Sequence, residues 1–410
     1  AMAYANYRNL SLPNVYQWAT AATLSSSSSF MYNSNFSQNQ LINVGSQDNS
    51  NFFGLYDIAG NVREWIVNSL SDDSSIKGIL GGSFNDEPYY FNDYFGQNSM
   101  DRSLGNGLRL VKNLESEFKT DITANDQYYV KVRDFLNEKN VSDDVFEIFK
   151  SQYDYDISEL NKEEKTLDYS FSSFAVDQFY IDAAYNNERL PGYVFYDKNI
   201  KKPYKPIIFF PGSGSINTDS FENGIENRMK QFSYLLSEGY ALIHPIYKST
   251  FERRDNIKSD YPDETDEYKN AVIRWGKDYK RAIDYIQSRD DMDINSLSYY
   301  GISWGGSIAN ILLAIDDRVK NSVLYVAGIE FQTCKKEVDK FYYTSRIKIP
   351  VLMLNGKFDH FFPLETSQIP MFKLLGTPEK DKKHYVYETG HYVPRDELIK
   401  LHLEWLAKYE

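Results

Sequence analysis

The chain has 410 residues and a net charge of −13, and 42% of its residues are hydrophobic. This length suits two or three domains, each with its own core. The acidic balance disfavours nucleic-acid phosphates and anionic membranes as the main partner, because both repel a negative surface. The single cysteine, Cys334, excludes an intrachain disulfide framework and any multi-cysteine metal site.

The sequence contains no pattern typical of a membrane span or a secretory signal. No apolar run approaches the roughly 18 residues that a spanning helix needs, and no signal-peptide pattern occurs before Phe30. One thiol suits either the cytoplasm or the periplasm. The compartment, the oligomeric state and the presence of a signal or anchor upstream of residue 1 therefore stay open.

Residues 1–113 are rich in Asn, Ser, Gly and aromatic residues, which predicts a loop-rich domain. Four phrases stand out in it: LPNVYQWATAA from Leu12, GLYDIAGNVREW from Gly54, GGSFND from Gly81 and GNGLRLVK from Gly105. In this order they resemble the C-terminal half of the formylglycine-generating (sulfatase-modifying factor) family. The resemblance implies a small domain with the C-type-lectin-like fold of that family.

The family's oxidase chemistry is not expected here. Its members hold copper with a cysteine pair, and iron-dependent relatives use histidines. In this chain no histidine precedes His244 and no cysteine precedes Cys334. Residues 1–113 are therefore predicted to be non-catalytic.

The same resemblance implies a structural calcium ion around the GNVREW phrase, held by oxygen ligands as Ca²⁺ prefers. The implied ligands are the carboxylates of Asp57 and Glu64 and the main-chain carbonyls of Gly60 and Val62. The alternative, a capped turn with a surface glutamate, stays open.

Residues 114–165 are strongly charged and are predicted to form a helical linker without chemistry. Ser142, followed by DDVFEIFKSQ, is typical of an N-cap serine with acidic residues in the first helical turn. From Leu167 the pattern changes to alternating apolar and polar residues, which predicts antiparallel strands at the start of a domain over residues 166–410.

Short apolar strands then alternate with amphipathic helices, which predicts an α/β fold with a mostly parallel sheet covered on both faces. The expected strands are residues 205–210, 240–246, 322–328, 351–359 and 384–390, and the expected helices are residues 222–238, 268–288 and 396–409.

One further strand and helix, over residues 296–315, meet at Gly301-Ile302-Ser303-Trp304-Gly305. This is a G-x-S-x-G pattern, in which a sharp strand-to-helix turn exposes the serine as a nucleophile. The flanking glycines suit a turn where the backbone is strained and closely packed. The pattern alone is weak, and its weight comes from the strand before it and the helix after it.

A serine hydroxyl needs a base to accept its proton and a carboxylate to orient that base. Asp359 in NGKFDHFFP and His391 in YETGHYVP each follow an apolar strand, in the order Ser, Asp, His. We therefore predict a catalytic triad of Ser303, Asp359 and His391. Asp359 also fits as a simple turn residue. The histidines at 244, 360, 384 and 402 are less well placed.

The tetrahedral intermediate of such a reaction needs two N–H donors for its oxyanion. Trp304, directly after the nucleophile, is expected to supply one, and the PGSGS loop after residue 210 the other. Ser213 is the first choice in that loop and Gly214 the second. A plain glycine turn is the alternative, while a nucleotide loop is disfavoured because no G-K-[ST] follows.

These residues resemble the α/β-hydrolase superfamily, and more narrowly the dienelactone hydrolase and prolyl-oligopeptidase-like esterases. FPGSG stands where HGG is common. The phrases YKSTFERR, YGISWGGS, VLMLNGKFDHFFP and LLGTPEKDKKHYVYETGH are similar to bacterial hydrolase modules that follow a sulfatase-modifying-factor-like domain. That resemblance implies a Ser/Thr kinase upstream in the same polypeptide.

The sequence thus predicts a serine hydrolase that cleaves a small-molecule carboxylic ester through an acyl-enzyme, without a catalytic cofactor. A prolyl-oligopeptidase-like peptidase and a catalytically silent scaffold module are the alternatives. Substrate contacts are expected from Phe361, Phe362 and Tyr392, and Arg253 or Arg254 would suit an acidic substrate.

Overall fold

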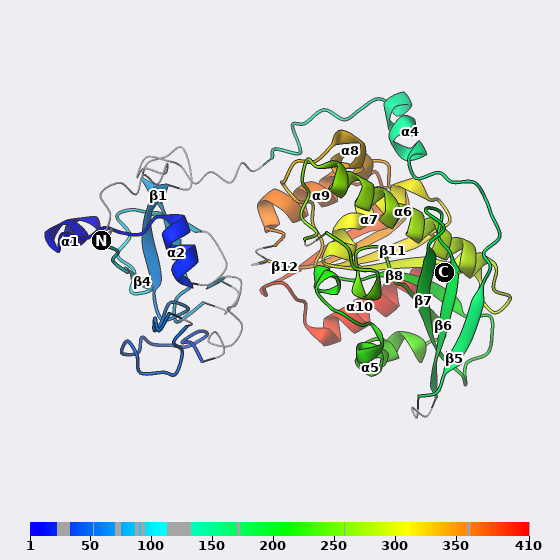
Figure 1. Cartoon of the computed structure of the whole chain (residues 1–410), viewed down its shortest axis with the longest axis horizontal. Coiled ribbons are helices and arrows are strands. Elements are labelled where there is room, and N and C mark those ends of the chain that lie inside the picture. Colours follow the sequence, from blue (N-terminus) through cyan, green and yellow to red (C-terminus); the bar gives the residue numbers. More distant parts are fainter. Residues whose placement is uncertain are drawn as a thin grey trace. The chain divides into compact units, whose positions relative to one another are not determined.

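The computed structural model divides the chain into two compact units, Ala1–Lys131 and Val132–Glu410 (Figure 1). No described helix is both long and apolar enough to cross a membrane. The structure describes residues 1–22, 33–51, 53–69, 75–86, 90–91, 95–112, 133–169, 173–257, 259–357, 359 and 361–409.

The N-terminal unit has little regular structure, as its composition predicts. Its described strands form a four-stranded sheet in the order β3-β2-β1-β4. A small core of apolar side chains, including Trp18, Phe36 and Ile58, packs beside it. The elements are α1 (Met2–Tyr7), α2 (Val15–Ala22), β1 (Arg63–Ser69), β2 (Ile76–Leu80), β3 (Phe95–Asn98) and β4 (Asn106–Gly107).

The described strands of the C-terminal unit form a nine-stranded sheet in the order β13-β12-β11-β10-β8-β9-β7-β6-β5. Strands β5, β6 and β7 pair antiparallel with one another, and β7 also pairs antiparallel with β9. From β9 through β8, β10, β11 and β12 to β13, each strand is parallel to its neighbour in the sheet. The predicted α/β fold with its antiparallel beginning is therefore confirmed. The strands are β5 (Glu163–Leu167), β6 (Phe174–Asp182), β7 (Arg189–Asp197), β8 (Lys205–Phe210), β9 (Tyr240–Pro245), β10 (Ser298–Ile302), β11 (Asn321–Tyr325), β12 (Val351–Gly356) and β13 (Lys382–Tyr387).

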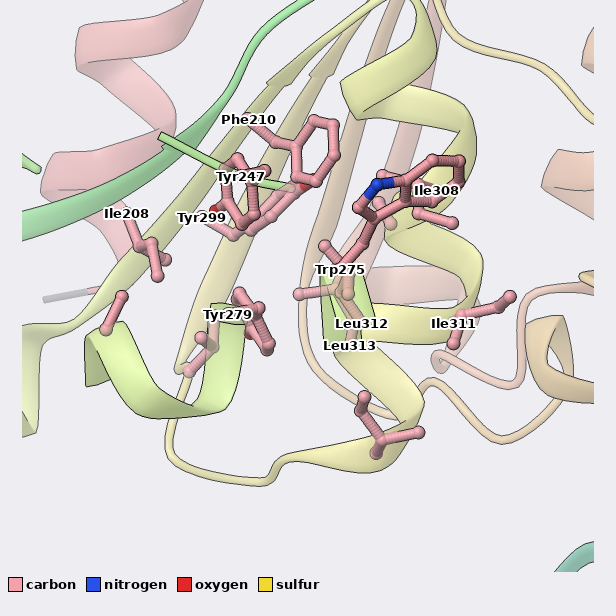
Figure 2. Close-up of a cluster of buried hydrophobic side chains, with 14 of the residues drawn as sticks. Ile208, Phe210, Tyr247, Trp275, Tyr279, Tyr299, Ile308, Ile311, Leu312 and Leu313 are labelled. Atoms are coloured by element: carbon pink, nitrogen blue, oxygen red, sulfur yellow. The ribbon is translucent and has the colours of Figure 1, made fainter. Parts of the chain in front are cut away.

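Helices cover both faces of this sheet (Figure 1). Successive side chains of a strand point to opposite faces. Along β8, Ile208 and Phe210 join the core under α6 (Asp266–Gln287) and α7 (Trp304–Ile315). Ile207 and Phe209 join the core under α5 (Ile225–Leu236) and α10 (Arg395–Lys408). Figure 2 shows the first core, where Phe210, Trp275 and Ile308 lie close together.

Short helices were not predicted in the connections on either side of β12. They are α8 (Phe341–Thr344) before it and α9 (Ile369–Leu374) after it. Both segments are too short to show a helical period in the sequence.

The described part of the charged segment 114–165 lies within the C-terminal unit and packs against its core. Helix α4 (Asp143–Ser151) begins at the predicted N-cap, where the Ser142 side chain accepts a hydrogen bond from the N–H of Val145. Phe146 from α4 is buried in the same core as α6 and α7, together with Phe135 and Tyr153. The segment therefore contributes apolar side chains to the core of the C-terminal unit.

We expect Phe146→Ala to lower the free energy of unfolding of the C-terminal unit by about 3 kcal/mol, because it leaves a cavity. The ring is 5% exposed and packs on Tyr343 with 5.3 Å between ring centroids. Ile148, on the same helix, is 66% exposed, and Ile148→Ala should change stability by less than about 0.5 kcal/mol. Urea denaturation followed by tryptophan fluorescence would measure both. Equal effects would mean that α4 does not belong to this core.

Candidate active site

Ser303 lies at the turn between β10 and α7 in a strained backbone conformation, with φ +54° and ψ −111°. The flanking glycines make this turn sterically possible. A Cβ at Gly301 would lie 2.4 Å from the carbonyl oxygen of Gly305, and a Cβ at Gly305 would lie 2.1 Å from that of Phe210. Any side chain at either position would force the backbone apart.

Hydrogen bonds hold the strained turn in place. The N–H of Ser303 donates to the carbonyl of Tyr325 at 2.8 Å, and the N–H of Gly305 donates to that of Pro211 at 3.0 Å. The hydroxyl of Tyr299 donates to the carbonyl of Gly305 at 2.6 Å. Neighbouring strands therefore fix the elbow from both sides.

Three side chains from distant parts of the sequence form one hydrogen-bonded chain at this turn. His391 Nε2 lies 2.8 Å from Ser303 Oγ, and His391 Nδ1 lies 2.7 Å from Asp359 Oδ2. The other oxygen of Asp359 accepts hydrogen bonds from the N–H groups of Phe361 and Phe362. With the proton on Nδ1 donated to Asp359, Nε2 is free to accept the proton of Ser303.

Solvent exposure differs along this chain of groups. The side chain of Asp359 is fully buried, whereas that of His391 is 21% exposed. A buried carboxylate with three donors stays in one orientation, while the imidazole remains partly accessible to solvent. The arrangement can therefore move a proton between Ser303 and a bound molecule.

The loop after β8 reaches the elbow because β8 and β10 are parallel neighbours. A Cβ on Gly212 would lie 3.6 Å from the Cβ of Ser303. Ser213 follows as the first residue of a 3₁₀ turn, and Gly214 is exposed, with open space where its Cβ would be. Trp304 is the first residue of α7, and the N–H groups of a first helical turn have no partner within the helix.

Two protein-family models match the chain. The sulfatase-modifying factor enzyme 1-like domain matches residues 1–114, and the dienelactone hydrolase family matches residues 191–391. Residues 191–391 of the C-terminal unit form a dienelactone hydrolase domain. It follows a sulfatase-modifying-factor-like domain in the same polypeptide, as the sequence phrases predict.

Solved structures support the α/β-hydrolase fold of this dienelactone hydrolase domain. An acetyl xylan esterase from Paenibacillus sp. R4 aligns with 66% of this chain and 96% of its own, at 18% identity and a TM-score of 0.50. Acetyl xylan esterase 1 from Thermoanaerobacterium sp. JW/SL YS485 aligns with 67% of this chain and 96% of its own, at 14% identity and a TM-score of 0.51. No curated protein matches the chain by sequence.

The other described histidines of the hydrolase domain are poorly suited to proton transfer. Burial lowers the pKa of His244 and of His402 to about 3, and that of His384 to about 4. His360 lies outside the described residues. Among the described histidines, His391 is the one that contacts a serine and a carboxylate together.

The residues expected to contact substrate occupy different environments. Phe361 and Tyr392 are 44% and 51% exposed, and the ring of Phe361 lies 4.8 Å from that of His391. Phe362 is only 3% exposed and packs inside. Phe361 and Tyr392 can therefore touch a molecule at the triad, whereas Phe362 supports the loop from within.

The suggestion that Arg253 binds an acidic substrate is wrong. Its guanidinium donates to Asp278 at 2.6 Å and to the hydroxyl of Tyr185 at 2.7 Å, and its side chain is 8% exposed. Arg254 is exposed and pairs with Asp219. Arg253 thus fixes the base of the loop after β9 and is not available to a ligand.

A buried polar cluster below the nucleophile was not predicted. Ser307, one turn along α7 from Ser303, donates its hydroxyl to Glu330 Oε2 at 2.5 Å, and Lys340 donates to Glu330 Oε1 at 2.6 Å. The Lys340 and Glu330 side chains are 4% and 2% exposed. The three residues are far apart in sequence and follow no motif, so they give no local signal.

Asp260, in the loop after β9, lies within electrostatic reach of this cluster and of His391. Burial and the negative charge of Glu330 together raise the pKa of Asp260 to about 6, against the opposing effects of Lys340 and His391. Folding therefore favours its neutral form. The loss of stability that comes from ionising Asp260 is absent below the usual aspartate pKa of about 4. It grows as pH rises through about 6.

We expect Asp260→Asn to raise the stability of the hydrolase domain by about 2 kcal/mol at pH 7 to 8, because an amide needs no deprotonation. The difference should vanish near pH 4, where the carboxyl is protonated in both states. Melting temperatures of the two proteins across this pH range would measure it, with exposed Glu267→Gln as the control. A constant difference at every pH would contradict the assignment.

The carboxylate of Glu64, an implied calcium ligand, is already satisfied by cationic and N–H donors. Arg109 donates to both of its oxygens, at 2.8 and 3.1 Å, and the indole N–H of Trp18 donates at 2.8 Å. Burial raises the pKa of Glu64, and Arg109 opposes that rise. A calcium ion bound through Glu64 would have to displace or face the guanidinium.

The carboxylate of Asp57, the other implied acidic ligand, is also engaged by N–H donors. The oxygens of Asp57 accept hydrogen bonds from the N–H of Gly45 and from the amide of Asn49. Gly60 forms a bridge with Asn35, while Val62 packs close to Gly107. No group of three or more His, Cys, Asp or Glu among the described residues could hold a metal. The residues therefore do not fit the implied calcium site.

We expect Arg109→Met to destabilise the N-terminal domain by about 3 kcal/mol, because it leaves the Glu64 carboxylate buried without its cation. The double variant Glu64→Gln/Arg109→Met should recover part of that loss, and exposed Arg102→Met should have little effect. Scanning calorimetry with and without EDTA would measure this. A calcium-dependent melting temperature would contradict the ion-pair assignment.

Proposed function

We propose that the dienelactone hydrolase domain is a serine hydrolase that cleaves carboxylic esters. The observation that carries this proposal is the continuous hydrogen-bonded chain from Ser303 through His391 to Asp359, with distances of 2.8 and 2.7 Å. Such a chain activates a serine hydroxyl, which by itself is a weak nucleophile.

In the proposed reaction, His391 Nε2 takes the hydroxyl proton as Ser303 Oγ attacks the ester carbonyl. Asp359 orients the imidazole and stabilises the imidazolium that forms. The imidazolium then protonates the departing alcohol oxygen, leaving an acyl group on Ser303. Water, deprotonated by His391, attacks that acyl group and releases the acid. The reaction needs no organic cofactor.

The negative charge that develops on the carbonyl oxygen needs N–H donors aimed at it. We assign one donor to Trp304, whose N–H belongs to the first turn of α7. The second comes from the loop that begins at Gly212, with Ser213 as first choice and Gly214 as second. The close approach of Gly212 to Ser303 supports this loop as the second source.

An ester substrate is favoured over other acyl compounds by the family to which the domain belongs. A lactone is a cyclic ester, and the two structural neighbours described above are named as acetyl xylan esterases. The exposed rings of Phe361 and Tyr392 would contact the substrate beside His391. A small-molecule ester with an apolar part suits this surface.

We expect hydrolysis of p-nitrophenyl acetate, with kcat reduced by about 10⁴-fold or more in Ser303→Ala. Asp359→Asn should reduce kcat by about 10³- to 10⁴-fold, because it destabilises the required imidazole tautomer. Initial rates at 405 nm are the measurement, and Ser237→Ala, at an exposed serine after α5, is the control.

A fluorophosphonate probe tests the nucleophile separately from the choice of ester. Labelling of the native protein but not of Ser303→Ala would identify Ser303 as the reactive residue. If neither the ester nor the probe reacts at Ser303, the domain is a scaffold with the hydrolase fold and the proposal fails.

A further inference from the structure

A cavity lies close to the triad, at the ends of β10 and β11 and between α5 and α10. Its volume is about 240 Å³, roughly that of eight water molecules in the liquid. This is below the usual range for drug-sized ligands but large enough for a single ring with small substituents. None of the three triad residues is among the described residues that line it.

The walls of the cavity combine aromatic surface with a few converging polar groups. Three tyrosines, Tyr234, Tyr300 and Tyr325, line it, with Arg395 as the only charged side chain among the described lining residues. Burial raises the pKa of each tyrosine, and the nearby positive charge of Arg395 opposes that rise in all three. The four groups therefore face the same small space, and the phenols are neutral.

Arg395 and Tyr325 keep capacity for a ligand, whereas the hydroxyl of Tyr234 already lies 2.9 Å from Nδ1 of His402. Arg395 donates to the carbonyl of Gln231 at 3.1 Å, which uses one of its five N–H groups. The hydroxyl of Tyr325 accepts a hydrogen bond from the N–H of Val393 at 3.2 Å, so its proton is free to be donated. A guanidinium beside phenolic hydroxyls is a typical arrangement for a carboxylate with a further polar substituent.

We propose that this cavity binds a small aromatic hydroxy acid. Its carboxylate would pair with the Arg395 guanidinium, its hydroxyl would accept a hydrogen bond from the hydroxyl of Tyr325, and its ring would lie on the apolar wall that includes Ile302. A neutral ligand of the same shape would lack this charge-assisted hydrogen bond to the guanidinium.

The position of the cavity connects it to both catalytic loops. The carbonyl of Tyr325 accepts the N–H of Ser303 at 2.8 Å, and Ile302 directly precedes the nucleophile. The hydroxyl of Tyr325 holds Val393, two residues after His391. A bound acid would therefore touch the residues that hold the two loops in place, without occupying the triad.

Titration calorimetry with 4-hydroxybenzoate tests the proposal, because it detects binding whether or not the protein hydrolyses esters. We expect saturable binding with a Kd below ~10 mM. Arg395→Met should weaken it by about tenfold or more, since a charge-assisted hydrogen bond is lost. Lys400→Met, which removes an exposed charge elsewhere on α10, should leave the affinity unchanged. The amide analogue 4-hydroxybenzamide should bind as weakly to the native protein as the acid binds to Arg395→Met.

The location is tested with His391→Gln, which removes the catalytic imidazole and leaves the cavity lining intact. This variant should bind 4-hydroxybenzoate as the native protein does. Loss of binding in His391→Gln but not in Arg395→Met would place the acid in the catalytic cleft and overturn the proposal. Absence of saturable binding to the native protein, or equal affinity of Arg395→Met and Lys400→Met, would also overturn it.

Discussion

The close approach of three backbone segments beneath Ser303 is the constraint on which the rest of the hydrolase domain depends. The end of β8, the end of β10 and the first turn of α7 meet with no space for a side chain at Gly301 or Gly305. This contact forces Ser303 into a strained conformation and exposes its hydroxyl. A strained backbone conformation persists only when many surrounding contacts hold it in place. The sheet and its helices must therefore be rigid here.

The rigidity comes from dense packing directly behind the elbow. The indole of Trp304 lies between Phe210 and Trp275, with ring centroids 4.9 and 4.8 Å away in edge-to-face contacts. Figure 2 shows Phe210 and Trp275 among the buried residues of this core. One turn further along α7, Ser307 binds the buried pair of Glu330 and Lys340. The aromatic core thus fixes the position of α7, and the polar cluster fixes its rotation.

Features that are local in sequence could be predicted, and features that depend on long-range contacts could not. The elbow is recognisable because its glycines, serine and flanking strand and helix are contiguous. Strand alternation and helical periodicity indicated the α/β fold, and chain order suggested Asp359 and His391, which the structure brings to Ser303. Whether these three residues catalyse a reaction stays a prediction.

Long-range contacts explain what sequence reasoning missed or misjudged. Glu330 meets Ser307 across 23 residues of sequence and Lys340 across 10, with no pattern to connect the three. Arg253 looked like a solvent-exposed loop residue, but its partner Asp278 is buried on α6. In both cases the tertiary structure decides whether a charged side chain is exposed to solvent or forms a buried ion pair.

The phrases that carry the resemblance of the N-terminal domain also hold its structure together. Trp18, Glu64 and Arg109 come from three of the four phrases that carry the resemblance, and they form one buried hydrogen-bonded cluster. The fourth phrase joins through Asp86, which binds Arg63 through both oxygens at 2.7 and 2.8 Å.

These contacts hold together a domain with few strands, so each phrase has a structural role that is independent of any metal or redox group. Replacing one member would leave a buried charge or an indole N–H unpaired, at a cost of several kcal/mol. The phrases therefore identify the domain of residues 1–114, while the expectation that it lacks the family's oxidase chemistry stays a prediction.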